Sequence, residues 1–158
     1  MTLEKYQDPD VIRRVLTYPR VAVVGLSGNE LRASNFVGRY LQIRGYDVIP
    51  VNPREPMILG KTCYPSLSDI PGGVDTVDVF RRADAVPAIA EEAVAIGAKC
   101  LWLQFGVISQ EGVDIATEGG MDVVMDRCIK IEHARYLGRM HWLGLNTGRI
   151  SARRAKPE

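Results

Sequence analysis

The sequence predicts a three-layer, doubly wound α/β protein built on a parallel sheet of about five strands. Short segments such as Val21–Val24 and Cys100–Leu103 are apolar throughout, which is typical of strands buried on both faces. Most of these segments are separated by stretches whose apolar residues follow the 3.6-residue repeat of a helix. Gly25 directly follows the first such segment and permits a tight turn from a strand into a helix.

The N-terminal third predicts a helix, a strand, a helix and a second strand. Asp8 and Pro9 are a typical N-cap and first helical residue, and a strand is expected at Val21–Val24. A second helix is expected from about Ser34 to Arg44, where Gly45 ends it. The buried faces of the two helices are expected to contain Val11, Ile12, Val15 and Leu16 in the first and Phe36, Val37, Tyr40 and Leu41 in the second. The second strand is expected at Tyr46–Val51.

The rest of the chain continues the alternation after one long segment, Asn52–Gly73, that is rich in proline and is expected to be irregular. Strands are then expected at Asp75–Phe80, Cys100–Leu103 and Met121–Met125. Helices are expected from Asp84 or Ala85 to Gly97, from a Ser109 cap to Glu118, and at Ile129–Leu137.

Length and composition indicate one globular domain spanning residues 1–158, with a short basic tail from about residue 149. The net charge of +1 gives no general attraction for nucleic acid or a membrane surface. The chain has no apolar run long enough to cross a membrane and no apolar signal core, so we expect a cytoplasmic protein. The three cysteines fit neither a disulfide framework nor a metal site; they are Cys63, Cys100 and Cys128.

The turn after the first strand is the first candidate anion site. Ligands of open parallel sheets bind beyond the carboxyl ends of the strands, where helix N-termini offer unpaired amides. Gly25 lets a phosphate approach the backbone, Ser27 and Ser34 supply hydroxyls, and Arg32 supplies a charge. A strand-to-helix turn with a capping serine is the simpler alternative, because this turn lacks the G-x-G-x-x-G pattern and is not a P-loop.

The next two turns add arginines. A fold that takes NAD has an acidic residue after the second strand, whereas this chain has Asn52, Pro53 and Arg54. Arg54 is suited to a phosphate on the adenosine ribose, as in NADP or coenzyme A. A solvated arginine in a loop is the equal alternative. Arg81 and Arg82 follow the third strand and indicate a further anion contact.

The fourth turn combines an aromatic residue, an amide and a glycine. Trp102, Gln104 and Gly106 offer a flat wall, an amide side chain and a close backbone that suit an extended arm such as pantetheine. Core packing is the commoner fate of a tryptophan in a strand, so both interpretations of Trp102 stay open.

These residues together resemble the small stand-alone coenzyme A-binding proteins of bacteria, whose domain is similar to the N-terminal domain of the succinyl-CoA synthetase α subunit. The resemblance runs from about Pro9 to Leu137 and rests on the joint occurrence of Val21-Ala-Val-Val-Gly25-x-Ser27, Arg32-x-Ser34, Gly45-Tyr46-x-Val48-x-Pro50-Val-Asn-Pro53, Gly60-x-x-Cys63-Tyr64-x-Ser66-Leu67-x-Asp69-Ile70-Pro71, Val77-Asp78-Val79-Phe80-Arg81-Arg82, Trp102-x-Gln104-x-Gly106-Val107 and Val124-Met125-Asp126-Arg127-Cys128.

The resemblance implies a Rossmann-like fold that holds coenzyme A, or an acyl-CoA, across the strand ends. It places the phosphates and adenosine at Gly25, Ser27, Arg32, Ser34, Asn52, Pro53 and Arg54, and the rest of the ligand at Arg81, Arg82, Gln104 and Gly106. One departure from the pattern is Ala33, where proline often precedes the serine.

No catalytic or metal-binding constellation is recognisable, so the sequence favours a noncatalytic carrier, sensor or partner protein. His133 and His141 are far in sequence from the first turn, and a structural or surface role is expected for His133. Cys128 is expected to be a buried, unreactive sulfur, with a mixed disulfide to coenzyme A as the alternative. Two other functions stay open: an NADP-dependent oxidoreductase, or the nucleotide-binding subunit of an acyl-CoA ligase completed by another chain. The partners expected are the small molecule and a possible second copy or partner subunit.

Overall fold

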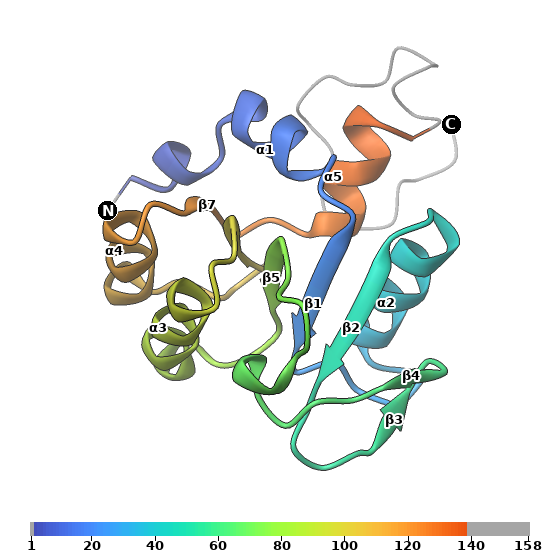
Figure 1. Cartoon of the computed structure of the whole chain (residues 1–158). Coiled ribbons are helices and arrows are strands. Elements are labelled where there is room, and N and C mark those ends of the chain that lie inside the picture. The colour runs from blue at the N-terminus through green and yellow to red at the C-terminus, as the bar shows by residue number, and fades with distance from the viewer. Residues whose placement is uncertain (1, 139–158) are drawn as a thin grey trace.

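The computed structural model describes residues 2–138 and contains one five-stranded parallel sheet, with the strand order β2-β1-β5-β6-β7. Five α-helices among these residues flank the sheet on both faces, so the predicted three-layer, doubly wound α/β fold is confirmed (Figure 1). The strands are β1 (Arg20–Val24), β2 (Asp47–Val51), β5 (Thr76–Val79), β6 (Cys100–Leu103) and β7 (Asp122–Met125). The predicted C-terminal tail and His141 lie outside the described residues.

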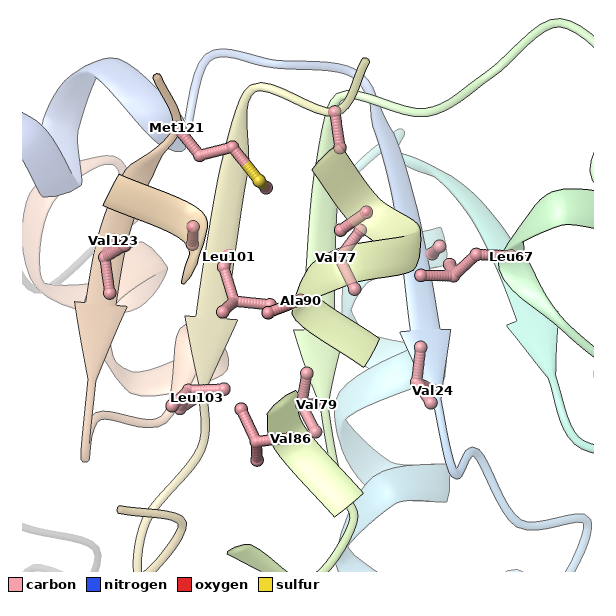
Figure 2. Close-up of a cluster of buried hydrophobic side chains, with 14 of the residues drawn as sticks. Val24, Leu67, Val77, Val79, Val86, Ala90, Leu101, Leu103, Met121 and Val123 are labelled. Atoms are coloured by element: carbon pink, nitrogen blue, oxygen red, sulfur yellow. The ribbon is translucent and has the colours of Figure 1, made fainter. Parts of the chain in front are cut away.

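Two separate apolar cores cover the two faces of the sheet. One core joins β1, β5 and β6 to α3 (Val86–Ala95) and α4 (Gln110–Glu118). Figure 2 shows side chains of this core, with Ala90 of α3 beside Val77 of β5 and Leu101 of β6. The other core joins the opposite face to α1 (Pro9–Val15), α2 (Ala33–Ile43) and α5 (Ile129–Tyr136).

Two of the helix caps confirm the sequence prediction. The Asp8 carboxylate accepts a hydrogen bond from the Asp10 amide at 2.9 Å at the start of α1. Ser109 Oγ accepts one from the Gly112 amide at 3.0 Å at the start of α4. Each side chain satisfies an amide that the helix leaves without a backbone partner.

The buried face of α2 differs from the prediction. Phe36 was expected in the core, but it is 48% exposed and stacks under the Arg39 guanidinium, 4.8 Å from its ring centre. The buried side of the helix instead contains Ser34, Asn35 and Gly38 together with Val37 and Leu41. The hydrophobicity of Phe36 was therefore a poorer guide than its position on the helix.

The segment predicted to be irregular contains a short hairpin. Strands β3 (Met57–Ile58) and β4 (Lys61–Thr62) pair antiparallel across Leu59 and Gly60, which both have positive φ angles. Two such residues form a tight hairpin turn, but leucine is an unusual choice for it, so the turn carried no sequence signal. Two short 3₁₀ helices, η2 (Leu67–Asp69) and η3 (Ala83–Ala85), flank β5, and a third, η1 (Leu3–Tyr6), precedes α1.

Candidate functional site

The centre of the sheet creates a crevice at its carboxyl edge. Strands β1 and β5 are neighbours, but the chain leaves β1 toward α2 and β2 on one side and leaves β5 toward α3 and β6 on the other. The two connections diverge over opposite faces of the sheet, and open α/β sheets bind their ligands at this switch point. The first and third predicted turns, with Gly25 and Arg81, therefore meet here.

Gly25 is required by the close approach of these two turns. Its φ angle is +88°, and a Cβ atom at this position would lie 2.6 Å from the carbonyl oxygen of Phe80. The Gly25 amide donates to the carbonyl of Val51 at 2.9 Å, which ties the end of β1 to the end of β2. A residue with a side chain here would push the first turn away from β5.

Serine and asparagine side chains hold the loop between β1 and α2 in place. Ser34 Oγ accepts from the Ser27 amide at 3.0 Å, and Ser27 Oγ accepts from the Asn29 amide at 3.0 Å. Asn35 Nδ2 donates to the carbonyl of Ser27 at 2.8 Å. Ser34 lies inside the first turn of α2 and Arg32 is the N-cap residue without a side-chain cap, so the expected capping by a serine is wrong, while a purely structural turn stays the alternative to an anion site.

The N-terminus of α2 keeps two amides available for a ligand. The amides of Ala33 and Ser34 have no acceptor within residues 2–138, as expected for the first residues of a helix. Ala33 donates an amide that the proline of the family pattern would lack. With the exposed Arg32 and with Gly25, Ser27 and Phe80, these residues line a depression of about 360 Å³, here called the α2 depression.

The second turn is anchored to the first by Asn52. Its Nδ2 donates to the carbonyl of Leu26 at 3.1 Å, and its Oδ1 accepts from the Arg54 amide at 2.8 Å. Pro53 and Arg54 are exposed beside it. The carboxylate of Glu55 accepts from the Gly28 amide at 3.0 Å, a contact between the two turns that sequence reasoning missed. Nothing in the pattern of residues marks Glu55, because its partner is found only when both turns are folded.

A second, more apolar depression lies between the ends of β1 and β2 and helix α3. This α3 depression has a volume of about 280 Å³ and is lined by Val24, Val51, Pro53, Leu67, Arg81 and Ile89, among others. Arg81 lines the α3 depression and packs beside Gly25 of the α2 depression, since a Cβ atom on Gly25 would lie 2.9 Å from the Arg81 Cδ. Arg82 lines neither of these two depressions and forms an exposed ion pair with Asp84 at 3.4 Å.

The end of β6 differs from the other turns, because its polar groups are bonded within the protein. Gln104 is 3% exposed, and its Nε2 donates to Asp78 Oδ1 at 2.6 Å. Asp78 is fully buried, and its Oδ2 has no hydrogen-bond partner within residues 2–138. Burial raises the pKa of Asp78 to about 8, while the hydrogen bond from Gln104 opposes the shift. The amide of Gly106 donates to Asp126 Oδ1 at 2.8 Å, although Gly106 itself is exposed.

Trp102 belongs to the core and not to a binding wall. Its side chain is completely buried, and its Nε1 donates to the carbonyl of Arg127 at 2.8 Å. Of the two interpretations left open by the sequence, core packing is confirmed.

The remaining nucleophilic and titratable candidates are structural in character. His133 is buried, with its Nδ1 2.8 Å from the Tyr40 hydroxyl, and burial lowers its pKa. Cys128 was expected to be buried but is only partly buried, because it lies in the turn just before α5; desolvation still raises the pKa of its thiol, which disfavours the reactive thiolate. The three cysteines are free thiols, and residues 2–138 contain no cluster of His, Cys, Asp and Glu that could hold a metal ion. In the same residues, no helix is long and apolar enough to span a membrane.

The fold and the crevice define a Rossmann-like α/β protein whose carboxyl edge carries backbone amides, hydroxyls and arginines. The CoA binding domain family matches residues 19–134, and the chain belongs to this family.

Two relatives show how the domain is used in other chains. The chain is 43% identical over 115 residues to the "Uncharacterized protein YneT" of Bacillus subtilis, across 73% of this chain and 85% of the relative. It is 31% identical over 125 residues to "Acetate--CoA ligase [ADP-forming] I" of Archaeoglobus fulgidus, across 72% of this chain but 18% of the ligase. The domain is therefore most of the first protein and a small part of the second.

Solved structures confirm the fold. A "hypothetical protein from Pyrococcus horikoshii OT3" is similar with a TM-score of 0.83 and 38% identity, covering 87% of this chain and 98% of that one. The dinucleotide-forming acetyl-coenzyme A synthetase 1 of Ca. Korarchaeum cryptofilum is similar with a TM-score of 0.60 and 26% identity, covering 68% of this chain and 26% of the synthetase.

Proposed function

We propose that this protein binds coenzyme A or an acyl-CoA at the carboxyl edge of its sheet and acts as a noncatalytic carrier, sensor or partner protein. The observation that carries the proposal is the α2 depression, where two unpaired helix amides, two serine hydroxyls and Arg32 face one cavity beside the Gly25 turn. Such a set of donors at a helix N-terminus is suited to a pyrophosphate. Membership of the CoA binding domain family supports coenzyme A as the source of that pyrophosphate.

The two depressions divide the ligand between them. The pyrophosphate occupies the α2 depression, and the adenine ring lies in the apolar α3 depression against Val51, Pro53 and Ile89. Arg54 and Arg81 are placed to meet the phosphate on the ribose, because both lie on turns beside this path. Gln104 and Gly106, at the end of β6, lie along the path of the pantetheine arm. Arg82 contributes only general positive charge.

A second candidate function is that of a partner subunit, which the ligase relatives favour. In the ligase of A. fulgidus the matching segment makes up 18% of the chain, so the domain there accompanies other parts of a larger protein. In this candidate the present chain supplies the coenzyme A site, and another chain supplies the remaining parts. We also propose that residues 1–158 fold as one domain and act in the cytoplasm, where the three free thiols stay reduced.

Isothermal titration calorimetry with coenzyme A, dephospho-coenzyme A, NADPH and NADH tests the proposal. Coenzyme A should bind most tightly, and dephospho-coenzyme A should bind about tenfold more weakly, because it lacks the ribose phosphate that an arginine would bind. Tighter binding of NADPH would overturn the proposal in favour of the oxidoreductase. Native mass spectrometry of protein taken directly from cells would separate the two candidates, because it reads both a bound ligand and a bound partner chain.

A further inference from the structure

The Glu55 carboxylate is placed where it opposes an anionic ligand. It accepts from the Gly28 amide at 3.0 Å, in the loop whose neighbouring residues line the α2 depression. The carboxylate lies directly against the Cα of Gly28, so that any side chain at this glycine would collide with it. A negative charge therefore rests on the loop to which the proposed function assigns a pyrophosphate.

The acceptor at Gly28 differs in kind from the acceptors of its neighbours. The amides of Ser27, Asn29 and Leu31 donate to neutral oxygens of Ser34, Ser27 and Asn29, all within the loop and the first turn of α2. The Gly28 amide donates to a charged oxygen from another turn of the protein. Carboxylate and phosphate oxygens are both anionic acceptors that backbone amides bind, so one can replace the other.

The contact can break without disturbing the fold. It is exposed to solvent, and Glu55 lies between Pro53 and Pro56, which restrict the backbone of the second turn. Asn52 independently joins the same two turns through its bond to Leu26. Rotation of the Glu55 side chain is therefore enough to free the Gly28 amide.

We propose that Glu55 is an intramolecular competitor of the ligand, whose carboxylate occupies the Gly28 amide in the free protein and is displaced by a pyrophosphate oxygen on binding. This inference rests on the proposed function and adds a control on it. The affinity for coenzyme A is then set below what the arginines and helix amides alone would give. Changes that draw Glu55 away from the loop raise that affinity.

Calorimetry with coenzyme A on the full chain tests the proposal with three variants. Glu55→Ala should lower the Kd about fivefold, the equivalent of the largest exposed charge contacts. Glu55→Gln should fall between the wild type and Glu55→Ala, because it removes the charge and keeps an acceptor. The matched control is Glu30→Gln, which removes the same charge from an exposed position of the same loop and should change the Kd less than about twofold.

Nuclear magnetic resonance of the Gly28 amide gives a second readout. In the free protein its signal should move in Glu55→Ala, whereas with saturating coenzyme A the wild type and Glu55→Ala should agree at Gly28. Dephospho-coenzyme A should show the same gain in affinity, because it keeps the pyrophosphate. A gain confined to coenzyme A would overturn the assignment to the pyrophosphate.

The remaining outcomes separate this inference from the proposed function. Weaker or unchanged binding in Glu55→Ala, with normal binding by the wild type, would overturn the competitor role and leave the function intact. Weaker binding would show that Glu55 positions the two turns. Failure of the wild type and all variants to bind coenzyme A would overturn the proposed function, and the inference with it.

Discussion

The polar groups at the carboxyl edge of the sheet are exposed in one half of the edge and hydrogen-bonded within the protein in the other half. In the half formed by β1, β2 and β5, the α2 amides and Arg32, Arg54 and Arg81 face solvent or a depression. In the half formed by β6 and β7, Gln104 bonds to Asp78 of the neighbouring strand β5 and the Gly106 amide bonds to Asp126. In the proposed function the exposed arginines and free α2 amides of the first half bind the ligand, so this half is here called the ligand half.

The first test addresses Gly25, at the centre of the ligand half. We expect Gly25→Ala to destabilise the protein by about 2 kcal/mol more than Gly45→Ala, through a collision with the Phe80 carbonyl. Both glycines have positive φ angles and both variants carry that strain, but a Cβ atom at Gly45 would meet nothing within 4 Å. Urea unfolding of both variants measures the difference. Equal losses would show that the crevice can widen to accept the methyl group.

The second test addresses the buried pair formed by Asp78 and Gln104. With a pKa of about 8 in the native state and about 4 when unfolded, Asp78 keeps a proton in this range that the unfolded chain releases. The unfolded state then binds fewer protons, so stability falls as pH rises from about 4 to 8, by up to about 1.4 kcal/mol per pH unit.

The Asp78→Asn variant should lack this loss and gain stability relative to the wild type as pH rises toward 8. Urea unfolding at several pH values measures the gain, with Asp114→Asn on the exposed face of α4 as control. A gain that does not depend on pH would mean that Asp78 is ionised in the native state.

The smallest expected effect separates two adjacent arginines. We expect Arg81→Ala to raise the Kd for coenzyme A about tenfold, because Arg81 lines the α3 depression beside Gly25 and a charged hydrogen bond contributes about this much. Arg82→Ala should have less than about a twofold effect, since its partner is the exposed Asp84. Calorimetry at low and high salt measures both, and the effect of Arg81→Ala should shrink at high salt. Equal effects of the two substitutions on the Kd would mean that Arg82, just before α3, also contacts the ligand.

Much of the fold could be predicted because a strand that is buried on both faces is apolar along its whole length. Cys100–Leu103 is a strand at the predicted bounds, and the Ser109 cap was visible from the residues beside it. Local sequence patterns were misleading where contacts with distant parts of the chain decide which residues are buried and how the backbone turns. Phe36 is apolar but lies on the outer face of α2, and the Leu59-Gly60 turn has no residue preference that marks it.

The candidate site divides in the same way. Gly25, Ser27 and Ser34 were identifiable, because a strand-to-helix turn places them together along the chain. Glu55 and Asp78 were not, because their partners Gly28 and Gln104 are brought to them by the fold, each from a distant segment. The ligand roles of the predicted site residues remain predictions, to be tested by the binding experiments above.

The contact between Gly25 and Phe80 has a consequence for how such a scaffold can diversify. The Phe80 carbonyl and the Arg81 side chain fill the space beside Gly25, so this position cannot gain a side chain without moving the turn. New ligand preferences must then arise at the rim, where Arg54, Glu55 and Arg81 are carried on turns that tolerate replacement. Gly25 is therefore expected to stay fixed as such proteins diverge, whereas Arg54, Glu55 and Arg81 are expected to be the first positions that differ.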